Sequence, residues 1–242
     1  YRAVHESIDR VVALKVLNPV NRSDDFVAHF FNEAKIQARL QHANVSTLYD
    51  FFEFDGLLCM AMEFIGGRGL DDIIVESGGL SMEEALPIFK DIVSAIGYIH
   101  QNGILHRDLK PGNIRIDQQG MVKLLDFGIA QDSVRDNSSN PRRILGTLQY
   151  MAPEQLSGKG SDHRTDIWSL GVLFYEMLTG QLPFGKETVI EYLDEVNNRK
   201  STKEVFRRAP LSEDAKALIY QCLERKPTQR YQSIRDLEQD LE

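Results

Sequence analysis

Short runs of strand-forming residues dominate the first quarter of the chain. Residues 11–17 are rich in valine and leucine, and residues 48–54 and 57–64 carry further apolar runs. Asp55 and Gly56, between the last two runs, form a dipeptide typical of hairpin turns. The pattern therefore predicts a small sheet in this part of the chain, with a hairpin across the last two runs.

One helical stripe interrupts these strands. Phe26, Phe30, Glu33, Gln37 and Leu40 recur three or four positions apart, which is the spacing of one face of a helix. Since the other members of this face are apolar, the side chains of Glu33 and Gln37 are expected to point inward.

Helical periodicity takes over after residue 80. Ser81 and Glu84 form a capping box, and the apolar stripe that follows predicts a long helix ending near Gly103. Pro87 lacks the amide that an interior helical position needs, so we expect it to bend the early turns. Further helices are predicted near residues 167–178, 187–198, 213–224 and 234–241, the first of them apolar on nearly all sides.

The two patterns divide the chain into a small, sheet-rich segment and a larger helical one. The glycine-rich stretch of residues 66–69 is the expected crossing, which gives a first unit of residues 1–66 and a second of residues 67–242. No repeat or flexible linker separates the units, so together they are expected to form one domain. The seam between two such units is where a ligand cleft forms.

Charge and composition exclude several classes of protein. Lys and Arg number 28 against 36 Asp and Glu, and a net charge of −8 repels nucleic acid and anionic membrane surfaces. The longest stretch without Asp, Glu, Lys or Arg, residues 92–106, is too short to span a bilayer. Cys59 and Cys222 form no paired motif, which suits two semi-buried thiols in a reducing compartment. We expect no nucleic acid, no membrane contact within this chain and a cytoplasmic location, whether alone or as the cytoplasmic domain of a larger, membrane-anchored protein.

The densest cluster of ionisable side chains spans residues 106–113, with the sequence His-Arg-Asp-Leu-Lys-Pro-Gly-Asn. Residues 120–125 predict a turn and a strand, so a hairpin would bring Asp126 back beside Asn113 and Asp108. An aspartate and an asparagine that converge on one point supply oxygen ligands for Mg²⁺, which binds together with substrate phosphates. The second carboxylate, that of Asp108, is left to orient a nucleophile.

Five motifs together resemble the ordered signature of protein kinases. They are residues 12–15 (Val-Ala-Leu-Lys), Glu33 on its helix, residues 106–113, residues 126–128 (Asp-Phe-Gly) and residues 152–154 (Ala-Pro-Glu). A single tripeptide recurs by chance, whereas five motifs in the family's order do not. The resemblance runs essentially from end to end of the chain. It implies an α+β, two-lobed protein-kinase-like fold, with a truncated small, mostly-β N-lobe that carries one key helix and a larger, mostly-α C-lobe.

Further positions narrow the class. Lys110 and Thr147 resemble the serine/threonine kinases, and residues 153–155 and 166–171 resemble kinases of bacterial type. The implied reaction transfers the γ-phosphoryl group of ATP to Ser or Thr hydroxyls of protein substrates. The implied partners are such proteins, and a second copy of the chain where it phosphorylates itself.

The resemblance implies a role for each residue that would hold ATP and metal. Lys15 would touch the α- and β-phosphates of ATP, oriented by Glu33. Asp126 would hold Mg²⁺, with Mn²⁺ as an alternative, and Asn113 would hold a second ion. The adenine would be surrounded by Ala13, Met62 and the backbones of Glu63 and Ile65.

Three other residues would act on the acceptor hydroxyl and the transferred group. Asp108 would accept a hydrogen bond from the hydroxyl and take its proton. Lys110 would neutralise charge that grows on the γ-phosphoryl group, and Thr147 would shape the acceptor site by bonding Asp108 or Lys110.

One motif position departs from the family. In protein kinases a stacked apolar column contains the counterparts of His106, Phe127 and Leu48, and its fourth member here is Gln37. A polar amide in this column should loosen the helix that carries Glu33 unless the amide finds a partner.

The resemblance assigns structural roles to three further residues. Glu154 and Arg230 resemble a buried ion pair that links the segment after residue 150 to the late helices. Asp166 is expected to brace the backbone of the 106–113 loop. Gly69 and Gly112 stand where relatives that seek arginine carry acidic residues, so no strong preference for basic substrates is implied.

The polar segment between Gly128 and Gly146 is the expected switch. It contains Ser133, Ser138 and Ser139, and the resemblance implies that Arg107 receives a phosphorylated residue of this segment. The alternative is a linker whose serines are never modified.

One part of the family signature is missing. No glycine precedes Gly56, whereas the family carries a glycine-rich loop before the strand of Lys15. We expect the parent chain to continue upstream with such a loop, because a full set of phosphate ligands has little use without phosphoryl transfer. Residues 1–5 are then expected to form a strand without its hairpin partner. The alternatives are a non-catalytic, kinase-like binding or scaffold module and a metabolic small-molecule kinase, the latter less compatible with residues 152–154.

Overall fold

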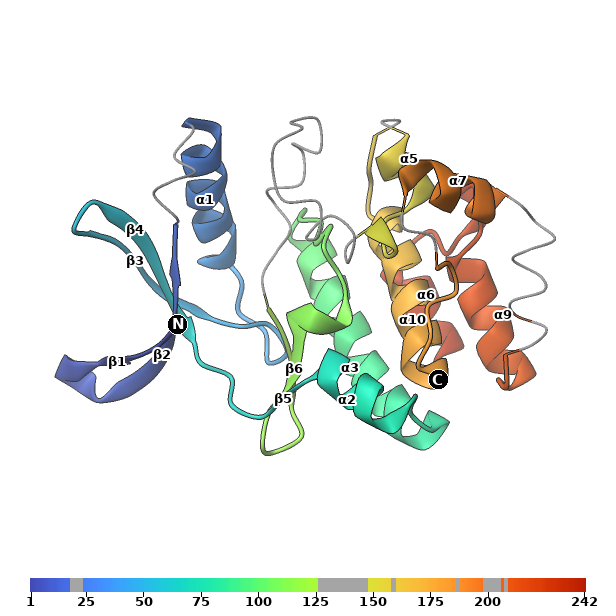
Figure 1. Ribbon diagram of the computed structural model, residues 1–242, viewed down its shortest axis with the longest axis horizontal. Helices are drawn as coiled ribbons and strands as arrows, with labels where there is room; N and C mark the ends of the chain where they lie inside the picture. The colour runs from blue at the N-terminus through green and yellow to red at the C-terminus, as the bar shows by residue number, and fades with distance from the viewer. Residues whose placement is uncertain (18–23, 126–147, 158–159, 186–187, 198–205, 207–208) are drawn as a thin grey trace.

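The computed structural model describes residues 1–17, 24–125, 148–157, 160–185, 188–197, 206 and 209–242. The first four strands and helix α1 (Asp24–Gln37) lie at one end of the molecule, and helices make up most of the other end (Figure 1). The chain starts in the strand-rich end and finishes among the helices. This is the expected α+β, two-lobed architecture.

The N-lobe is built on a four-stranded antiparallel sheet with the order β1-β2-β4-β3. Its strands are β1 (Arg2–His5), β2 (Arg10–Val16), β3 (Leu48–Phe54) and β4 (Leu57–Glu63). The predicted hairpin of β3 and β4 is confirmed. Asp55 and Gly56 take φ angles of 48° and 71°, the positive values that a tight hairpin turn requires.

The first strand has a partner, so the expectation that it lacks one was wrong. β1 pairs antiparallel with β2, from Arg2 opposite Ala13 to His5 opposite Arg10. The short 3-10 helix η1 (Glu6–Ile8) joins the two strands. The prediction placed the partner before residue 1, whereas a short turn at residues 6–9, in which Asp9 takes a positive φ of 47°, lets the chain fold back directly.

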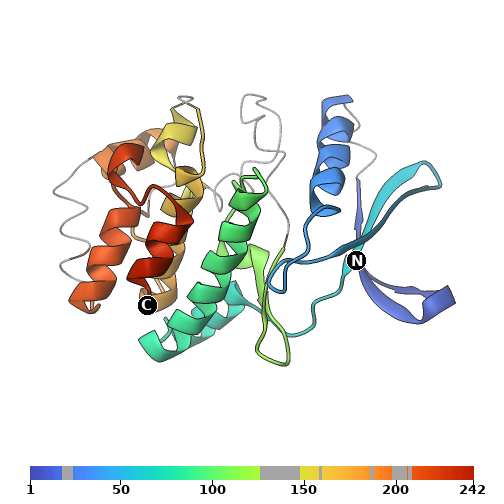
Figure 2. The same ribbon diagram turned by 180° about the vertical axis from the view of Figure 1, so that it is seen from behind.

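Helix α1 packs beside this sheet (Figures 1 and 2). Phe30 and Ala34 join Met60 and Met62 of β4 in the N-lobe core. On the same inward face, Glu33 and Gln37 are 7% and 0% exposed. The predicted inward stripe is therefore confirmed at these positions, polar members included, whereas the side chain of Phe26 lies outside the described part of the structure.

The C-lobe begins with a small sheet that the sequence pattern resolved only in part. β5 (Arg68–Gly69), β6 (Ile114–Ile116) and β7 (Val122–Leu124) pair antiparallel in that order. The β6–β7 hairpin agrees with the turn and strand predicted at residues 120–125. β5 and the helix that follows it, α2 (Leu70–Ser77), were not predicted. The boundary expected between residues 66 and 67 stays a prediction.

Helices form the rest of the C-lobe. α3 (Met82–Gln101) begins at the predicted capping box and runs through Pro87, where the expected bend stays a prediction. α6 (Arg164–Thr179) is buried on nearly all sides, as its apolar sequence predicts. The other helical elements are η3 (Pro111–Asn113), α5 (Pro153–Leu156), α7 (Val189–Asn197), α9 (Glu213–Cys222), η5 (Pro227–Gln229) and α10 (Ile234–Asp240).

Within the ranges described above, no helix combines the length and the hydropathy that a membrane span needs. Cys59 and Cys222 are unpaired and buried, more deeply than expected. Burial raises the pKa of the Cys222 thiol, so this thiol stays protonated at neutral pH.

The loop between α1 and β3 fastens the N-lobe to the C-lobe. The Leu124 amide donates to the Asn44 carbonyl oxygen at 2.8 Å, and the Ser46 amide donates to the Leu124 carbonyl oxygen at 2.9 Å. The Lys123 ammonium forms an ion pair with the Glu63 carboxylate at 2.8 Å. These bonds hold α1 and β4 in register with β7, and thereby with the 106–113 loop.

Candidate active site

The loop of residues 106–113 gathers three of the predicted side chains at one point. The Lys110 ammonium nitrogen lies 3.0 and 2.9 Å from the two carboxylate oxygens of Asp108. Asn113 donates from Nδ2 to the Asp108 carboxylate at 2.9 Å and to the Asp108 carbonyl oxygen at 2.7 Å. The turn η3 makes this possible because it folds Asn113 back over the loop. The ammonium of Lys110 and the side-chain amide of Asn113 are thus both within hydrogen-bond reach of the Asp108 carboxylate.

Asp166 of α6 holds this loop by its backbone. Its carboxylate accepts hydrogen bonds from the amides of His106 and Arg107, each at 2.9 Å, and contacts Nε2 of His100 at 2.8 Å. Complete burial alone would raise the Asp166 pKa, but the hydrogen bonds and the electrostatic attraction of His100 and His106 together favour the charged form more strongly, so the pKa lies below its usual value. Asp166 braces the loop as expected. Arg107 accordingly keeps a φ of 64°, which non-glycine residues rarely adopt.

Lys15 and Glu33 form an ion pair between the sheet and α1. The Lys15 ammonium nitrogen lies 2.5 Å from a Glu33 carboxylate oxygen. The Glu33 side chain is 9% exposed, and a carboxylate so deeply buried requires a charged partner. Lys15 lies on β2, so this pair fixes the position of α1 against the sheet.

The amide of Gln37 finds a partner in the loop that fastens the two lobes. Gln37 Nε2 donates to Oγ of Ser46 at 3.0 Å and, less closely, to its carbonyl oxygen at 3.3 Å. Oε1 of Gln37 is buried and has no hydrogen-bond partner among the described residues. His106, another expected member of the column, is 0% exposed, whereas Phe127 lies outside the described residues.

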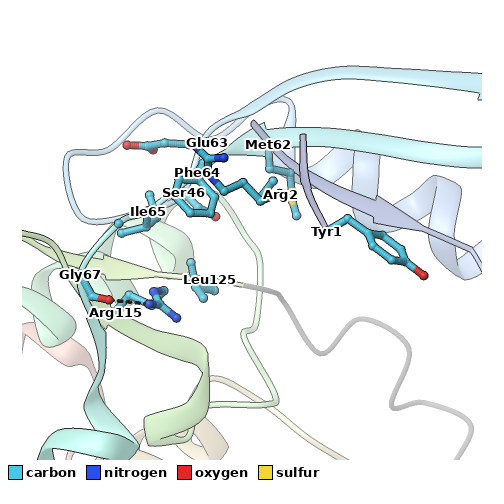
Figure 3. A pocket seen from close by; sticks show the side chains of 12 residues that line it. Tyr1, Arg2, Ser46, Met62, Glu63, Phe64, Ile65, Gly67, Arg115 and Leu125 are labelled. Atoms are coloured by element: carbon cyan, nitrogen blue, oxygen red, sulfur yellow. Dashed lines mark hydrogen bonds between the residues drawn. The ribbon is translucent and has the colours of Figure 1, made fainter. Parts of the chain in front are cut away.

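A pocket of about 490 Å³ lies between the two lobes (Figure 3). Figure 3 shows Tyr1 and Met62 on the side of the N-lobe sheet, with Gly67, Arg115 and Leu125 on the opposite side. The full lining is Tyr1, Arg2, Ala13, Ser46, Met62, Glu63, Phe64, Ile65, Gly66, Gly67, Arg115 and Leu125. The structure thus brings all four residues expected around the adenine into one pocket.

The pocket lining also refines the expectation for Glu63. The Glu63 amide donates to the Thr47 carbonyl oxygen at 2.8 Å. The Glu63 carboxylate forms an ion pair with Lys123 and accepts a hydrogen bond from the Thr47 amide at 3.2 Å. Of the Glu63 backbone, only the carbonyl oxygen could therefore serve a bound base. Sequence reasoning missed Ser46, Gly67 and Arg115, for which no motif gives a signal.

Several predicted site residues lie outside the described residues: Asp126, Thr147 and the serines at 133, 138 and 139. The Leu125 amide donates to the Asn113 carbonyl oxygen at 2.8 Å, so the hairpin returns the chain to Asn113 one position before Asp126. Asn113 uses Nδ2 on Asp108, and its Oδ1 is an oxygen ligand of the kind that Mg²⁺ takes. No group of three His, Cys, Asp or Glu side chains in the described ranges could hold a metal alone. The chemistry of Asn113 therefore fits a magnesium site that also needs Asp126.

Glu154 and Arg230 form the expected ion pair behind the site. Two guanidinium nitrogens of Arg230 donate to the two Glu154 carboxylate oxygens at 2.6 and 2.8 Å. Arg230 is 2% exposed, and its guanidinium carbon lies 4.9 Å from the centre of the Trp168 ring. This bidentate pair ties α5 to the segment before α10.

Comparison with known proteins agrees with this geometry. The sequence profile of the family described as protein kinase domain matches residues 1–240. The chain is 34% identical over 242 residues to the serine/threonine-protein kinase PrkC of Bacillus subtilis. This match covers 100% of this chain and 37% of PrkC. It is 34% identical over 242 residues to PknB of Mycobacterium tuberculosis, in a match that covers 97% of this chain and 38% of that protein. It is 35% identical over 254 residues to pkn3 of Myxococcus xanthus, in a match that covers 100% of this chain and 46% of that protein. The chain thus spans less than half the length of each of these relatives. With the family profile matching it almost throughout, the chain belongs to the protein kinase domain family.

Proposed function

We propose that this domain transfers the γ-phosphoryl group of ATP to Ser or Thr hydroxyls of protein substrates, including a second copy of itself. The observation that carries the proposal is one cluster of charged side chains in each lobe, together with a pocket between the lobes. The Lys15–Glu33 pair belongs to the N-lobe, and the cluster of Asp108, Lys110 and Asn113 belongs to the C-lobe. The relatives described above are named serine/threonine-protein kinases, and this supports the same class of acceptor.

The pocket supports a purine nucleotide as the phosphoryl donor. Ala13 and Met62 offer apolar contact to the base, and the backbones of Glu63 and Ile65 line the same space. Arg2 and Arg115 place positive charge in the lining, whereas the Glu63 carboxylate is engaged by Lys123. In a chain with a net charge of −8, this local excess of positive charge favours an anionic ligand.

In the proposed reaction, phosphates and acceptor are held by different residues. Lys15, oriented by Glu33, binds the α- and β-phosphates, and Asn113 and Asp126 would hold Mg²⁺ or Mn²⁺. Such an ion neutralises charge on the phosphates when it is bound. Lys110 lies beside Asp108, where it can approach the γ-phosphoryl group.

The proposed base is Asp108. Its carboxylate accepts a hydrogen bond from the acceptor hydroxyl and takes the proton as the oxygen attacks the γ-phosphorus and the bond from that phosphorus to the ADP leaving group breaks. Asn113 and Lys110 fix the orientation of this carboxylate through the contacts described above. Thr147 is proposed to shape the acceptor site. We further propose a cytoplasmic location, whether alone or as the cytoplasmic domain of a larger, membrane-anchored protein.

Transfer of radiolabelled phosphate from ATP tests the proposal. The protein is incubated with Mg²⁺, labelled ATP and a generic acceptor protein, and label is counted on Ser and Thr after acid hydrolysis. Asp108→Asn should abolish transfer, whereas Asp214→Asn, which alters an exposed carboxylate on α9, should leave it intact. Absence of label with the wild-type chain, or equal transfer by Asp108→Asn, would contradict the proposal.

A further inference from the structure

Arg115 places a cation in the wall of the pocket that no sequence motif indicated. It lies on β6, two residues after Asn113, and lines the pocket together with Leu125 on the C-lobe side. One terminal nitrogen of its guanidinium donates to the Gly67 carbonyl oxygen at 2.7 Å, the bond drawn in Figure 3. Its Nε is buried and has no hydrogen-bond partner among the described residues.

The position of Gly67 explains how this guanidinium is held. Gly67 has a φ of +92°, and a Cβ atom at this position would come within 2.2 Å of the Ile116 carbonyl oxygen. The segment of residues 65–67, which links the two lobes, therefore packs directly on β6 at Gly67. This places the Gly67 carbonyl oxygen within reach of Arg115. A hydrogen bond of this kind uses one edge of the planar guanidinium and leaves its faces available for stacking.

The charge of Arg115 has no counter-ion in the described part of the structure. Glu63 is the one acidic residue in the pocket lining, and its carboxylate is bound by Lys123. Arg2, the second cation of the lining, lies over the ring of Phe64, with 5.5 Å between its guanidinium carbon and the ring centre. A partly desolvated guanidinium with a buried, unpartnered nitrogen is stabilised by a ligand that offers it an electron-rich surface.

The ligand part that meets Arg115 is the base and not the phosphates. The pocket lining includes Ala13 of β2 and the linker residues Ile65 and Gly67, but it does not include Lys15. Since Lys15 is the proposed phosphate contact, Arg115 lies at the opposite, base-binding end. Ala13 comes from the N-lobe and Arg115 from the C-lobe, so a planar base between the lobes meets both.

We propose that Arg115 is a specificity-determining residue of this pocket, whose guanidinium stacks on the face of a bound purine base opposite Ala13. The inference rests on the proposed nucleotide-binding function and adds the chemistry by which the base is held. Guanidinium groups stack on nucleobases through dispersion and through attraction of the cation to the ring face. Arg115 thereby favours the broad ring of a purine.

Adenosine is the probe that tests this contact, because it lacks phosphates and so isolates the base. Its dissociation constant is measured by calorimetry for the wild-type chain, Arg115→Ala, Arg115→Lys and the control Arg68→Ala. Arg68 lies on the adjacent strand β5, pairs with Glu76 and does not line the pocket. We expect Arg115→Ala to bind adenosine roughly 3- to 30-fold more weakly, Arg115→Lys to recover only part of the loss, and Arg68→Ala to match the wild type.

A nuclear magnetic resonance measurement separates stacking from a merely structural role of Arg115 in holding the linker. In protein labelled with ¹⁵N-arginine, the Nε–Hε signal of Arg115 is assigned by its loss in Arg115→Lys. A base stacked on the guanidinium should move this proton signal upfield through its ring current. The measurement uses the wild-type chain, so it decides the question even where Arg115→Ala does not fold.

Two results would overturn the inference: wild-type affinity of a folded Arg115→Ala for adenosine, or an Arg115 signal that does not move at saturating adenosine. If ATP binds and phosphate is transferred in either case, only the role of Arg115 falls. If the wild-type chain binds neither adenosine nor ATP and transfers no phosphate, the proposed function and this inference fall together.

Discussion

Gln37 and Ser46 form a buried hydrogen bond that joins the helix carrying Glu33 to the loop bound to β7. The Nε2–Oγ distance is 3.0 Å, and both residues are less than 4% exposed. The Ser46 amide in turn donates to the Leu124 carbonyl oxygen, and Leu125 donates to Asn113. A chain of hydrogen bonds therefore runs from α1 to the 106–113 loop, near the position at which the resemblance implies an apolar column.

This relationship gives a first prediction about stability. Ser46→Ala should lower the free energy of unfolding by about 1–3 kcal/mol, because it leaves the buried Gln37 amide without its closest acceptor. The double variant Gln37→Met, Ser46→Ala removes both polar partners at similar volume, so it should recover most of the loss. Urea unfolding measures both. A double variant less stable than Ser46→Ala would show that the amide stabilises the column by itself.

The second prediction concerns the Lys15–Glu33 pair. Glu33→Gln removes the charge that fixes the Lys15 ammonium, so kcat/KM for ATP should fall by about 10²-fold through misplacement of one phosphate contact. The matched control is Glu76→Gln, which alters the exposed ion pair of Glu76 with Arg68 and should change kcat/KM little. Equal kinetics in the two variants would remove Glu33 from the proposed site.

The third prediction separates the proposed base from the proposed metal ligand. Asp108→Asn should leave the dissociation constant for a fluorescent ATP analogue within a few-fold of the wild type but remove most transfer. Asp126→Ala should abolish Mg²⁺-dependent binding of the analogue. Titration with and without Mg²⁺ decides the matter, since equal loss of binding in both variants is incompatible with the two assigned roles.

Much of this arrangement could be predicted because it depends on local patterns. The β3–β4 hairpin follows from one turn dipeptide, the start of α3 from one capping box, and the inward face of α1 from its periodicity. The clustering of Asp108 and Asn113 was predictable because they lie only five positions apart in the chain, and η3 folds them together.

What could not be predicted depends on tertiary contacts. β5 has two residues and β6 three, too few positions to show which side chains face the pocket, so Arg115 gave no signal. The sequence-based expectation of no strong preference for basic substrates likewise considered the residue at position 69 and not its neighbours in space. In the structure, a Cβ atom added to Gly69 would lie only 2.2 Å from a carboxylate oxygen of Asp71. An acidic group is therefore beside this position although the residue itself is glycine.

The fourth prediction concerns the buried pair of Glu154 and Arg230. Glu154→Gln leaves the guanidinium of Arg230, which is 2% exposed, without its anion, so the free energy of unfolding should fall by about 3–5 kcal/mol. Glu213→Gln is the control, because its partner Lys216 binds it at the surface and the loss should stay below about 0.5 kcal/mol. Urea unfolding of both variants checks the contrast, and similar losses would show that the Glu154 pair adds no more than a surface contact.

The last prediction follows from the lowered pKa of Asp166. In the folded chain this pKa lies below the usual 3.8, because the hydrogen bonds from His100 and the loop amides, with the electrostatic attraction of His100 and His106, together outweigh the effect of burial. A carboxylate with a depressed folded pKa contributes stability that is present above its unfolded pKa and is lost as pH falls through the folded value. The contribution of Asp166 should therefore be complete at neutral pH and decline below about pH 4.

Asp166→Asn tests this sign. An asparagine offers one acceptor oxygen where the carboxylate offers two, so its Nδ2 faces a donor of the loop and the variant should be less stable at neutral pH. Urea unfolding at a series of pH values should show this difference constant from neutral pH to about pH 5 and shrinking below about pH 4, since the wild type alone loses the contribution. Phosphate transfer by the variant should also fall at neutral pH, because the amides of His106 and Arg107 no longer hold the loop of Asp108. If the difference in the free energy of unfolding between the two proteins stays constant down to acid pH, Asp166 holds the loop without its charge.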